Sequence, residues 1–299
     1  MFEEKPETLS GAQIVVRLLE RQGVRTLTGI PGGAILPIYD ALSQSEQIRH
    51  VLVRHEQGGG FIAQGMSRAT GVPAVCMASS GPGATNLLTA IADAKLDSIP
   101  LVAITGQVPK ALIGTDAFQE VDTYGLSIPI TKHNFLVSAA EDLLTVIPRA
   151  FAIAASGRPG PVLVDIPKDV QNQLVEVRAW PAVGCAETPA LPAAPLIERA
   201  AAMINAAAKP ILYLGGGVVH SGAAEAAVAL AEIGRLPTVM TLMALGAMPV
   251  DHPLSLGMLG MHGARCTNLA LDECDLLIAV GARFDDRATG KVAGFCPQA

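Results

Sequence analysis

Residues 50–66, HVLVRHEQGGGFIAQGM, place a single glutamate between an apolar run and a helical pattern. The apolar run at 50–53 is short and rich in valine, which favours a β-strand. The segment that follows, at 61–66, has a composition typical of a helix. We therefore expect Glu56 in the first turn of a helix, at the carboxyl end of a strand. That edge of an open α/β sheet is where ligands bind.

Three glycines follow this glutamate at 58–60. They leave room for a flat ring or a neighbouring backbone to approach closely. A glutamate in a first helical turn also has a purely structural interpretation, because it complements the positive end of the helix dipole. On this stretch alone both interpretations stay open.

Short apolar runs alternate with helical patterns through the first half of the chain, and three of the five runs end directly before Gly, Pro or Ser. We expect strands at 24–28, 49–53, 73–78, 100–104 and 162–166. We expect helices at 9–22 (with Ser10 as its cap), 36–43, 59–69, 84–95 and 140–156. This rhythm predicts an α/β domain over residues 1–170 with a mostly parallel, doubly wound sheet.

A second α/β series follows a stretch that is rich in proline and alanine. Residues 171–195 are expected to form a linker, because they lack periodicity. Beyond it we expect helices at 196–207, 222–234 and 264–272, and strands at 210–214, 237–241 and 275–280. This series predicts a second doubly wound sheet in a domain over residues 196–299. The chain stops soon after the last expected strand, so we expect this domain to be incomplete and the chain to be truncated.

The composition narrows the class of protein. Hydrophobic residues make up 50% of the chain and charged residues 16%, which favours an oligomer or a protein with further domains. The net charge of −6 and the lack of a Lys/Arg cluster argue against nucleic acid as a partner. No apolar run reaches the length of a membrane span, and residues 1–7 do not resemble a signal or transit peptide. The five cysteines lack metal-ligand spacing, so we expect no metal site on them and free thiols in a reducing cytoplasm.

Three more turns with glycine and proline follow expected strands: GIPGG at 29–33, SSGPGATN at 79–86 and TGQVP at 105–109. The second opens a helix whose N–H groups could hold an anion, but it lacks the Gly-Lys-Ser/Thr of a nucleotide-binding loop. Such turns are weak signals alone, because tight βα turns need these residues anyway. Their combination with Glu56 and with DAFQEVD at 116–122 is much more specific.

Taken together, these motifs resemble the catalytic subunits of the acetolactate synthase family, which are thiamine diphosphate enzymes. The resemblance covers nearly the whole chain. The matching stretches are GIPGG, RHEQGGGFIAQGMSR, SSGPGATN, TGQVP, GTDAFQE, PITKHN, GRPGPVLVDIPKDVQ, LGMLGMHG and VGARFDDRATG. The resemblance implies that the first domain binds the pyrimidine of thiamine diphosphate and that the second is a central, FAD-binding domain.

The resemblance implies a proton relay through Glu56. A carboxylate bonded to the far nitrogen of the aminopyrimidine favours the imino tautomer, which then acts as an internal base; such a bond is strong in a dry pocket. Gln119 would lie near the reacting carbon, Phe118 in the substrate channel and Lys132 at its entrance. The ordinary alternatives are a core aromatic for Phe118 and a solvated charge for Lys132.

Further cofactor contacts are implied by the same resemblance. Thiamine diphosphate would be lined by Gly32, Gly33, Ala34, Pro82 and Asn86. FAD would be lined by Arg158, Gly215, Gly216, Gly217, Thr241, Leu242, Gly260, Met261, His262, Gly263, Gly281, Ala282, Arg283 and Asp285. The glycines at 215–217 alone are a weak signal, because His220 occupies the third glycine position of a dinucleotide fingerprint.

Arg287 is the third substrate residue that the resemblance implies. A guanidinium there would clamp the carboxylate of the second keto acid in a bidentate manner. The alternative is a surface arginine that pairs with Asp285 or Asp286, an interaction worth little.

The resemblance also implies parts that this sequence lacks. The diphosphate and Mg²⁺ site of these enzymes uses a Gly-Asp-Gly motif in a third, C-terminal domain, and no Gly-Asp-Gly occurs here. We therefore expect the chain to be inactive alone. The full enzyme would decarboxylate pyruvate and condense the product with pyruvate or 2-oxobutyrate, as a homodimer or homotetramer with a possible small regulatory subunit. The alternatives are a flavin-free catabolic acetolactate synthase, a pyruvate oxidase, a non-catalytic FAD-binding or oligomerising remnant, and, more distantly, an NAD(P)-binding module.

Overall fold

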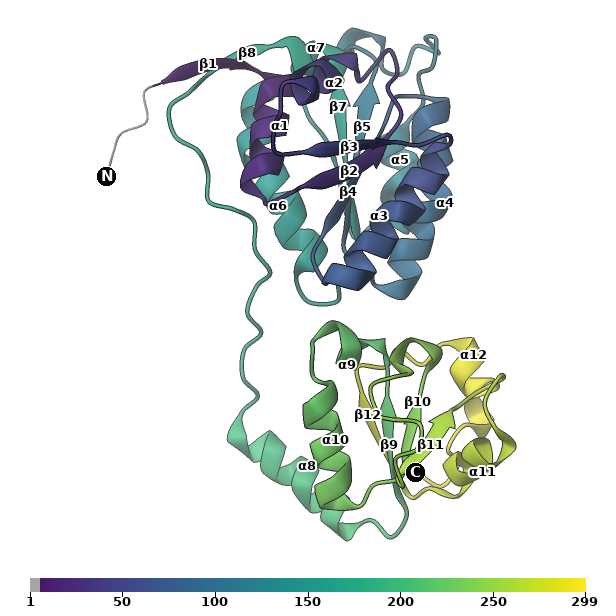
Figure 1. Cartoon of the computed structure of the whole chain (residues 1–299). Helices are drawn as coiled ribbons and strands as arrows, with labels where there is room; N and C mark the ends of the chain where they lie inside the picture. The colour runs from purple at the N-terminus through teal and green to yellow at the C-terminus, as the bar shows by residue number, and fades with distance from the viewer. Residues whose placement is uncertain (1–5) are drawn as a thin grey trace. The chain divides into compact units, whose positions relative to one another are not determined.

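The computed structural model describes residues 6–299, so the acidic start at 1–5 lies outside the described residues. The chain divides into a first unit, residues 1–189, and a second unit, residues 190–299, each with its own sheet (Figure 1). Within the described residues, no helix combines the length and the apolar character that a membrane crossing requires.

The sheet of the first unit has six parallel strands in the order β3-β2-β4-β5-β7-β6. The prediction of a mostly parallel sheet is therefore confirmed. The strands are β2 (Thr26–Gly29), β3 (Arg49–Leu52), β4 (Ala74–Ala78), β5 (Leu101–Gln107), β6 (His133–Leu136) and β7 (Pro161–Pro167).

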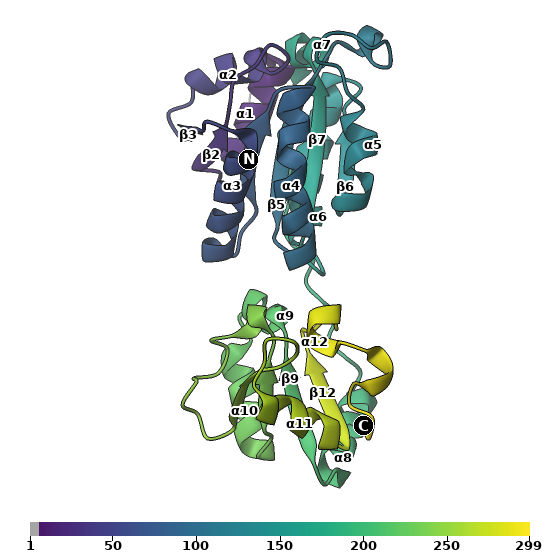
Figure 2. The same cartoon turned by 90° about the vertical axis from the view of Figure 1, so that its right-hand side faces the viewer.

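Helices cover both faces of this sheet (Figures 1 and 2). One face packs against α1 (Gly11–Arg21), α2 (Leu36–Ser43) and α6 (Leu143–Ala155), and the other against α3 (Glu56–Thr70) and α4 (Pro82–Asp97). Along β5, Val102 and Ile104 face the first group of helices, while Leu101 and Ala103 face the second. Burying each of the larger aliphatic side chains contributes about 1.5–3 kcal/mol, so both faces stabilise the sheet.

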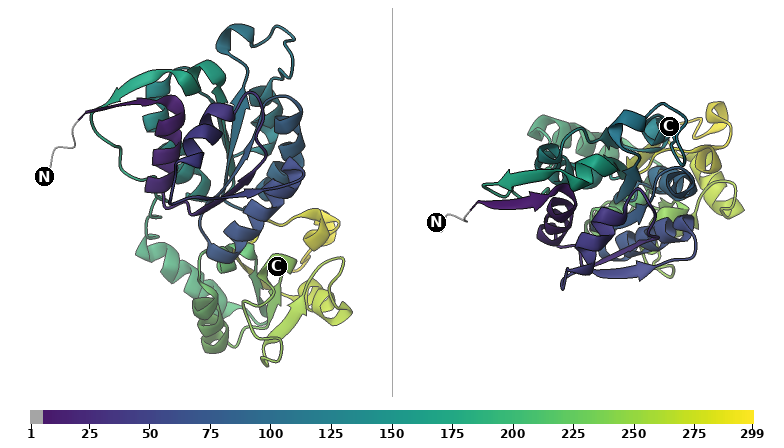
Figure 3. Two further views of the ribbon diagram at one scale, coloured as in Figure 1. Left: turned by 45° about the horizontal axis from the view of Figure 1, so that its top comes forward. Right: turned by 90° about the horizontal axis from the view of Figure 1, so that it is seen from above.

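The start of α1 is fixed by a capping box, and Ser10 is its N-cap as the sequence predicts. The Ser10 hydroxyl accepts from the Gln13 amide at 3.2 Å, and the Gln13 side chain accepts from the Ser10 amide at 2.9 Å. Just before it, β1 (Glu7–Ser10) pairs antiparallel with β8 (Leu174–Val177), and Figure 3 shows this ribbon beside α1.

Part of the stretch expected to be a linker is thus ordered in the first unit. Strand β8 lies inside residues 171–195, and its Val175 and Val177 are buried in the core beneath α1 and α6. Two valines that alternate with polar residues form a half-buried strand here because β1 is their pairing partner. A local sequence pattern does not reveal that partner. Two short helices complete the unit: α5 (Thr123–Ser127) and α7 (Lys168–Asn172).

The second unit has a four-stranded parallel sheet in the order β11-β10-β9-β12. Its strands are β9 (Pro210–Leu214), β10 (Thr238–Met240), β11 (Ser255–Met258) and β12 (Leu276–Val280). Its helices are α8 (Ala194–Ala206), α9 (Gly216–His220), α10 (Ala224–Gly234), α11 (Arg265–Glu273) and α12 (Asp286–Thr289). Each face of this sheet carries its own hydrophobic core, and alternate residues of β9 contribute to the two cores. Leu212 and Leu214 face one core, and Ile211 and Tyr213 face the other.

Candidate functional site

Glu56 is the first residue of α3 and follows β3, so the predicted position of this carboxylate is confirmed. The helix is capped by His55, whose Nδ1 accepts from the Gln57 amide at 3.2 Å. Because the strands are parallel, the turns after β2, β4 and β5 meet at the same edge of the sheet as Glu56.

The Glu56 carboxylate is held by an amide from the neighbouring helix. Asn86 of α4 donates from Nδ2 to Glu56 Oε2 at 2.9 Å. The other oxygen, Oε1, lies 3.5 Å from the position that a Cβ would take at Gly83. Asn86 therefore fixes the orientation of the carboxylate, and a glycine, with no side chain of its own, lies beside its second oxygen.

The turns after β2 and β4 pack against one another. A Cβ at Gly32 would lie 2.5 Å from the Cβ of Ser79, so only glycine fits there. The Ser79 hydroxyl accepts from the Ala34 amide at 3.3 Å. Gly33, in contrast, has no atom within 4 Å of the position of a Cβ. The turn at 29–33 is therefore held by contacts at Gly32 and Ala34, while Gly33 between them faces open space.

The segment after β5 returns to this edge through Gln119. A Cβ at Gly81, the N-cap of α4, would lie 2.6 Å from the Gln119 carbonyl oxygen. Gln119 itself has φ +57°, in the left-handed region that non-glycine residues rarely adopt. Strained residues of this kind cluster at functional sites. Its neighbour Phe118 is 87% exposed, which excludes the core-aromatic alternative within this chain.

Two predicted residues lie at the opposite edge of the same sheet. Lys132 precedes β6, and its Nζ donates to the carbonyls of Ile153 and Ser156. Burial and the neighbouring Lys95 lower the pKa of Lys132. Arg158, just before β7, donates from Nε to Ser98 Oγ at 2.7 Å. The first unit does not bring these side chains to Glu56, and their roles at the substrate entrance and the flavin stay predictions.

In the second unit, two glycine turns approach backbone on backbone. A Cβ at Gly215, after β9, would lie 2.3 Å from the Gly281 carbonyl oxygen, after β12. The Gly217 amide donates to the same oxygen at 3.0 Å. Beside them, after β10, Thr241 Oγ1 is buried and has no hydrogen-bond partner within the described residues, while Leu242 is largely exposed.

A third turn carries the predicted residues Gly260, Met261, His262 and Gly263. The Met261 amide donates to the Arg287 carbonyl at 2.8 Å, and a Cβ at Gly260 would lie 2.3 Å from that oxygen. The Asn268 side chain bonds both the amide and the carbonyl of Gly260, at 2.9 and 3.0 Å. This turn is therefore held against the segment 281–290, which brings the predicted flavin residues of the second unit to one edge of its sheet.

The charged residues of this edge pair with one another. Asp285 caps α12 through the amides of Arg287 and Ala288 and bonds the Arg283 guanidinium at 3.2 Å. The Arg287 guanidinium is mostly exposed and lies 3.9 Å from Asp286, a weak contact. The structure thus contains the surface ion pair between Arg287 and Asp286 that the alternative interpretation predicts. This pair nevertheless leaves the Arg287 side chain accessible to an anion.

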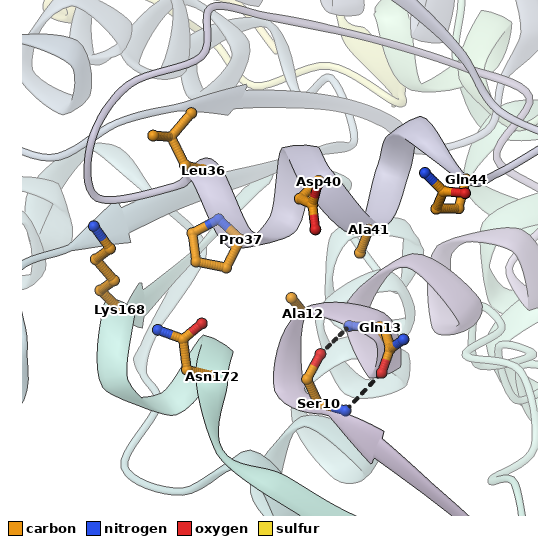
Figure 4. Close-up of a pocket in the computed structure, with 10 residues that line it drawn as sticks. All are labelled: Ser10, Ala12, Gln13, Leu36, Pro37, Asp40, Ala41, Gln44, Lys168 and Asn172. Atoms are coloured by element: carbon orange, nitrogen blue, oxygen red, sulfur yellow. Dashed lines mark hydrogen bonds between the residues drawn. The ribbon is translucent and has the colours of Figure 1, made fainter.

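An open cleft of about 580 Å³ lies elsewhere, between α1, α2 and α7 (Figure 4). None of the predicted site residues lines it. Two of its polar side chains, Ser10 and Gln13, are engaged in the capping box of α1. The candidate site is therefore the edge that carries Glu56 and not this cleft.

Sequence reasoning missed a buried polar cluster beside the segment after β5. Asp165 of β7 accepts from Thr105 Oγ1 at 2.6 Å and from Gln107 Nε2 at 3.0 Å. Burial raises the pKa of Asp165 to about 7. A signal was present, because an aspartate inside the apolar run VLVDIP at 162–167 is rare unless it has partners.

Known protein families match both units. Residues 9–126 match the family model "Thiamine pyrophosphate enzyme, N-terminal TPP binding domain", and residues 197–299 match "Thiamine pyrophosphate enzyme, central domain".

Curated relatives match nearly the whole chain. The acetolactate synthase isozyme 1 large subunit of Escherichia coli is 66% identical over 292 residues, 97% of this chain and 51% of that protein. An acetolactate synthase of Mycobacterium bovis is 56% identical over 98% of this chain and 48% of its own length. The acetolactate synthase large subunit of Corynebacterium glutamicum is 53% identical over 98% and 47%. The chain spans about half the length of these relatives.

Proposed function

Because the chain belongs to the family of thiamine pyrophosphate enzymes, we propose that its first unit binds the pyrimidine half of thiamine diphosphate through Glu56, as part of an acetolactate synthase. The observation that carries the proposal is the Asn86–Glu56 hydrogen bond of 2.9 Å at the carboxyl edge of the sheet. It leaves Oε1 beside Gly83, whose lack of a side chain would let a flat ring approach the carboxylate.

When bound, thiamine diphosphate supplies a carbon that attacks a keto acid and stabilises the carbanion left by decarboxylation. The residues of this chain would orient the ring and exchange its proton. Glu56 Oε1 would form the hydrogen bond to the ring nitrogen, while Asn86 keeps the carboxylate from rotating. Gln119, held against Gly81, would lie over the reacting atoms.

We propose that the second unit holds FAD. Its glycine turns admit no side chain where they meet, and Thr241 Oγ1 is a buried hydroxyl that a ligand group could partner. The flavin would serve mainly to hold the site, since the net reaction transfers no electrons. Arg287 would bind the carboxylate of the second keto acid as a bidentate pair.

For the whole protein we propose decarboxylation of pyruvate and condensation with pyruvate or 2-oxobutyrate, in the biosynthesis of valine and isoleucine in the cytoplasm. Two of the relatives are named large subunits, which supports an oligomer with a small regulatory subunit. The ligands of Mg²⁺ would lie outside residues 1–299, in a C-terminal domain.

The test is acetolactate formation from pyruvate by the full-length protein, with and without thiamine diphosphate and Mg²⁺. The proposal predicts turnover that requires both, with FAD bound. Binding of FAD without any turnover under all conditions would instead support the non-catalytic alternative.

A further inference from the structure

We propose that Gln107 is a positioning residue, which ties the segment 108–122 to the sheet and thereby holds Gln119 over the site of Glu56. The inference deepens the proposed function and, for its catalytic consequence, rests on it. Its structural part concerns the contacts of Gln107, which is not among the predicted site residues.

The Gln107 side chain joins the sheet to the far end of this segment. Gln107 is the last residue of β5 and is 2% exposed. Its Nε2 donates to the Val121 carbonyl at 2.9 Å and to Asp165 Oδ2 at 3.0 Å. Its Oε1 accepts from the Val108 amide at 2.9 Å. One buried amide thus bonds both the first residue of the segment and a residue near its end.

Asp165 and Thr105 help to determine which way that amide faces. Asp165 is 1% exposed, and its Oδ1 accepts from Thr105 Oγ1 at 2.6 Å. Its Oδ2 accepts from Gln107 Nε2, and the Val108 amide donates to Gln107 Oε1, so the NH₂ end of Gln107 faces Asp165. The second N–H of the same NH₂ group then points to Val121. The orientation of Gln107 is therefore set by Asp165 of β7 together with the Val108 amide and the Val121 carbonyl.

The held end lies two residues from Gln119. The Val121 carbonyl also accepts from the Thr123 amide at 2.8 Å, so the bond from Gln107 is the one that reaches it from the sheet. Gln119 has φ +57°, and such a conformation persists only where its surroundings over-determine it. The exposed Phe118 contributes little packing. Two constraints therefore act on Gln119: its backbone contact with Gly81 and the tie at Val121.

The other anchors of the segment lie near its start, within it, or at its last residue, Asp122, which is the N-cap of α5. The Lys110 amide donates to Asp169 at 3.0 Å, and Lys110 Nζ donates to the Ser138 carbonyl at 2.7 Å, both exposed. The Gly114 amide bonds Glu120 inside the segment. None of these bonds links Gln119 to the sheet.

The test compares amide hydrogen exchange at residues 112–121 in Gln107→Leu and in the matched control Gln64→Leu. Gln64 of α3 is also 2% exposed and donates from Nε2 to a backbone carbonyl, that of Ala90. We expect exchange in the segment to speed up roughly tenfold or more in Gln107→Leu only, because the loss of the bond to Val121 alone is worth about that factor. Equal exchange in the two variants would overturn the inference.

A conservative variant separates positioning from loss of stability. In Asp165→Asn the new amide can donate to Thr105 while its oxygen still accepts from Gln107, so protection of the segment should remain. If Gln107→Leu does not fold, Gln107→Met removes the same donors with an unbranched chain of similar length. Wild-type exchange in Gln107→Met would likewise contradict the proposal.

The catalytic consequence has a separate readout. If the full-length protein forms acetolactate, Gln107→Leu should lower kcat at least tenfold more than Gln64→Leu. The exchange result does not depend on turnover, so failure of this inference and failure of the proposed function are distinguishable. Faster exchange with an unchanged kcat would refute the positioning role of Gln107 in catalysis. The hydrogen bond from Gln107 would then hold the segment without affecting turnover.

Discussion

The two sheets present different kinds of carboxyl edge. In the first unit an ionisable side chain, Glu56, is oriented by Asn86 and has one carboxylate oxygen beside Gly83. In the second unit glycine turns pack directly on one another, and the charged side chains of Arg283 and Arg287 lie toward the solvent. The first edge presents an oriented carboxylate, and the second presents closely packed backbone.

The glycine packing of the second unit should be its most sensitive feature. Gly281→Ala places a Cβ 2.6 Å from the Val218 amide nitrogen at φ +63°, so steric overlap adds to backbone strain. We expect a loss of roughly 2–5 kcal/mol in the free energy of unfolding. Gly33→Ala, with nothing within 4 Å, should change it by less than about 0.5 kcal/mol. Denaturant unfolding of both variants measures this difference, and similar losses would contradict the comparison.

The buried acid of the first unit should make its stability depend on pH. The native pKa of Asp165 is about 7, above its ordinary value of 3.8, so the folded state keeps a proton that the unfolded chain has lost between these values. Stability from this group is full below pH 4 and falls as the pH rises to about 7, by up to roughly 1.4 kcal/mol per pH unit.

Asp165→Asn should remove this slope and raise the free energy of unfolding at pH 9 by roughly 2–4 kcal/mol. Urea unfolding at pH 4, 7 and 9 tests the prediction. Variant and wild type should converge near pH 4, and parallel curves across this range would show that Asp165 does not titrate as described.

The orientation of Glu56 depends on one amide. Asn86→Leu leaves the carboxylate without its partner, and a hydrogen bond to a charged group is worth roughly 1.5–3 kcal/mol. We expect turnover of the full-length protein to fall about 10- to 100-fold, with FAD content unchanged. Loss of FAD together with turnover would mean that Asn86 acts through stability.

Arg287 should matter for substrate and hardly for stability. Because its guanidinium is exposed and 3.9 Å from Asp286, Arg287→Lys should change the free energy of unfolding by less than about 0.5 kcal/mol. The KM for the second keto acid should rise, because lysine cannot form the bidentate pair. Steady-state kinetics with 2-oxobutyrate measures this effect, and an unchanged KM would leave Arg287 as a surface residue.

The sequence predicts the α/β alternation, because the buried strands β4, β5 and β7 are largely apolar runs. It predicts the place of Glu56 from the short apolar run before it and the helical pattern after it. It does not predict β6 (His133–Leu136) or β11 (Ser255–Met258), whose polar and glycine residues hide the strand pattern. The Gln107–Asp165 bond joins residues 58 positions apart. The bond forms because β5 and β7 are adjacent in the sheet. The order of strands in a sheet cannot be predicted from a local sequence pattern.

The most direct measurement is acetolactate formation by Glu56→Gln in the full-length protein, with bound FAD determined in the same sample. A glutamine keeps the size of the side chain and cannot exchange the proton. We predict turnover at least about 100-fold below that of the wild type, because a positioned acid or base usually contributes that much. The content of bound FAD should be unchanged. Turnover within twofold of the wild type would contradict the role of Glu56.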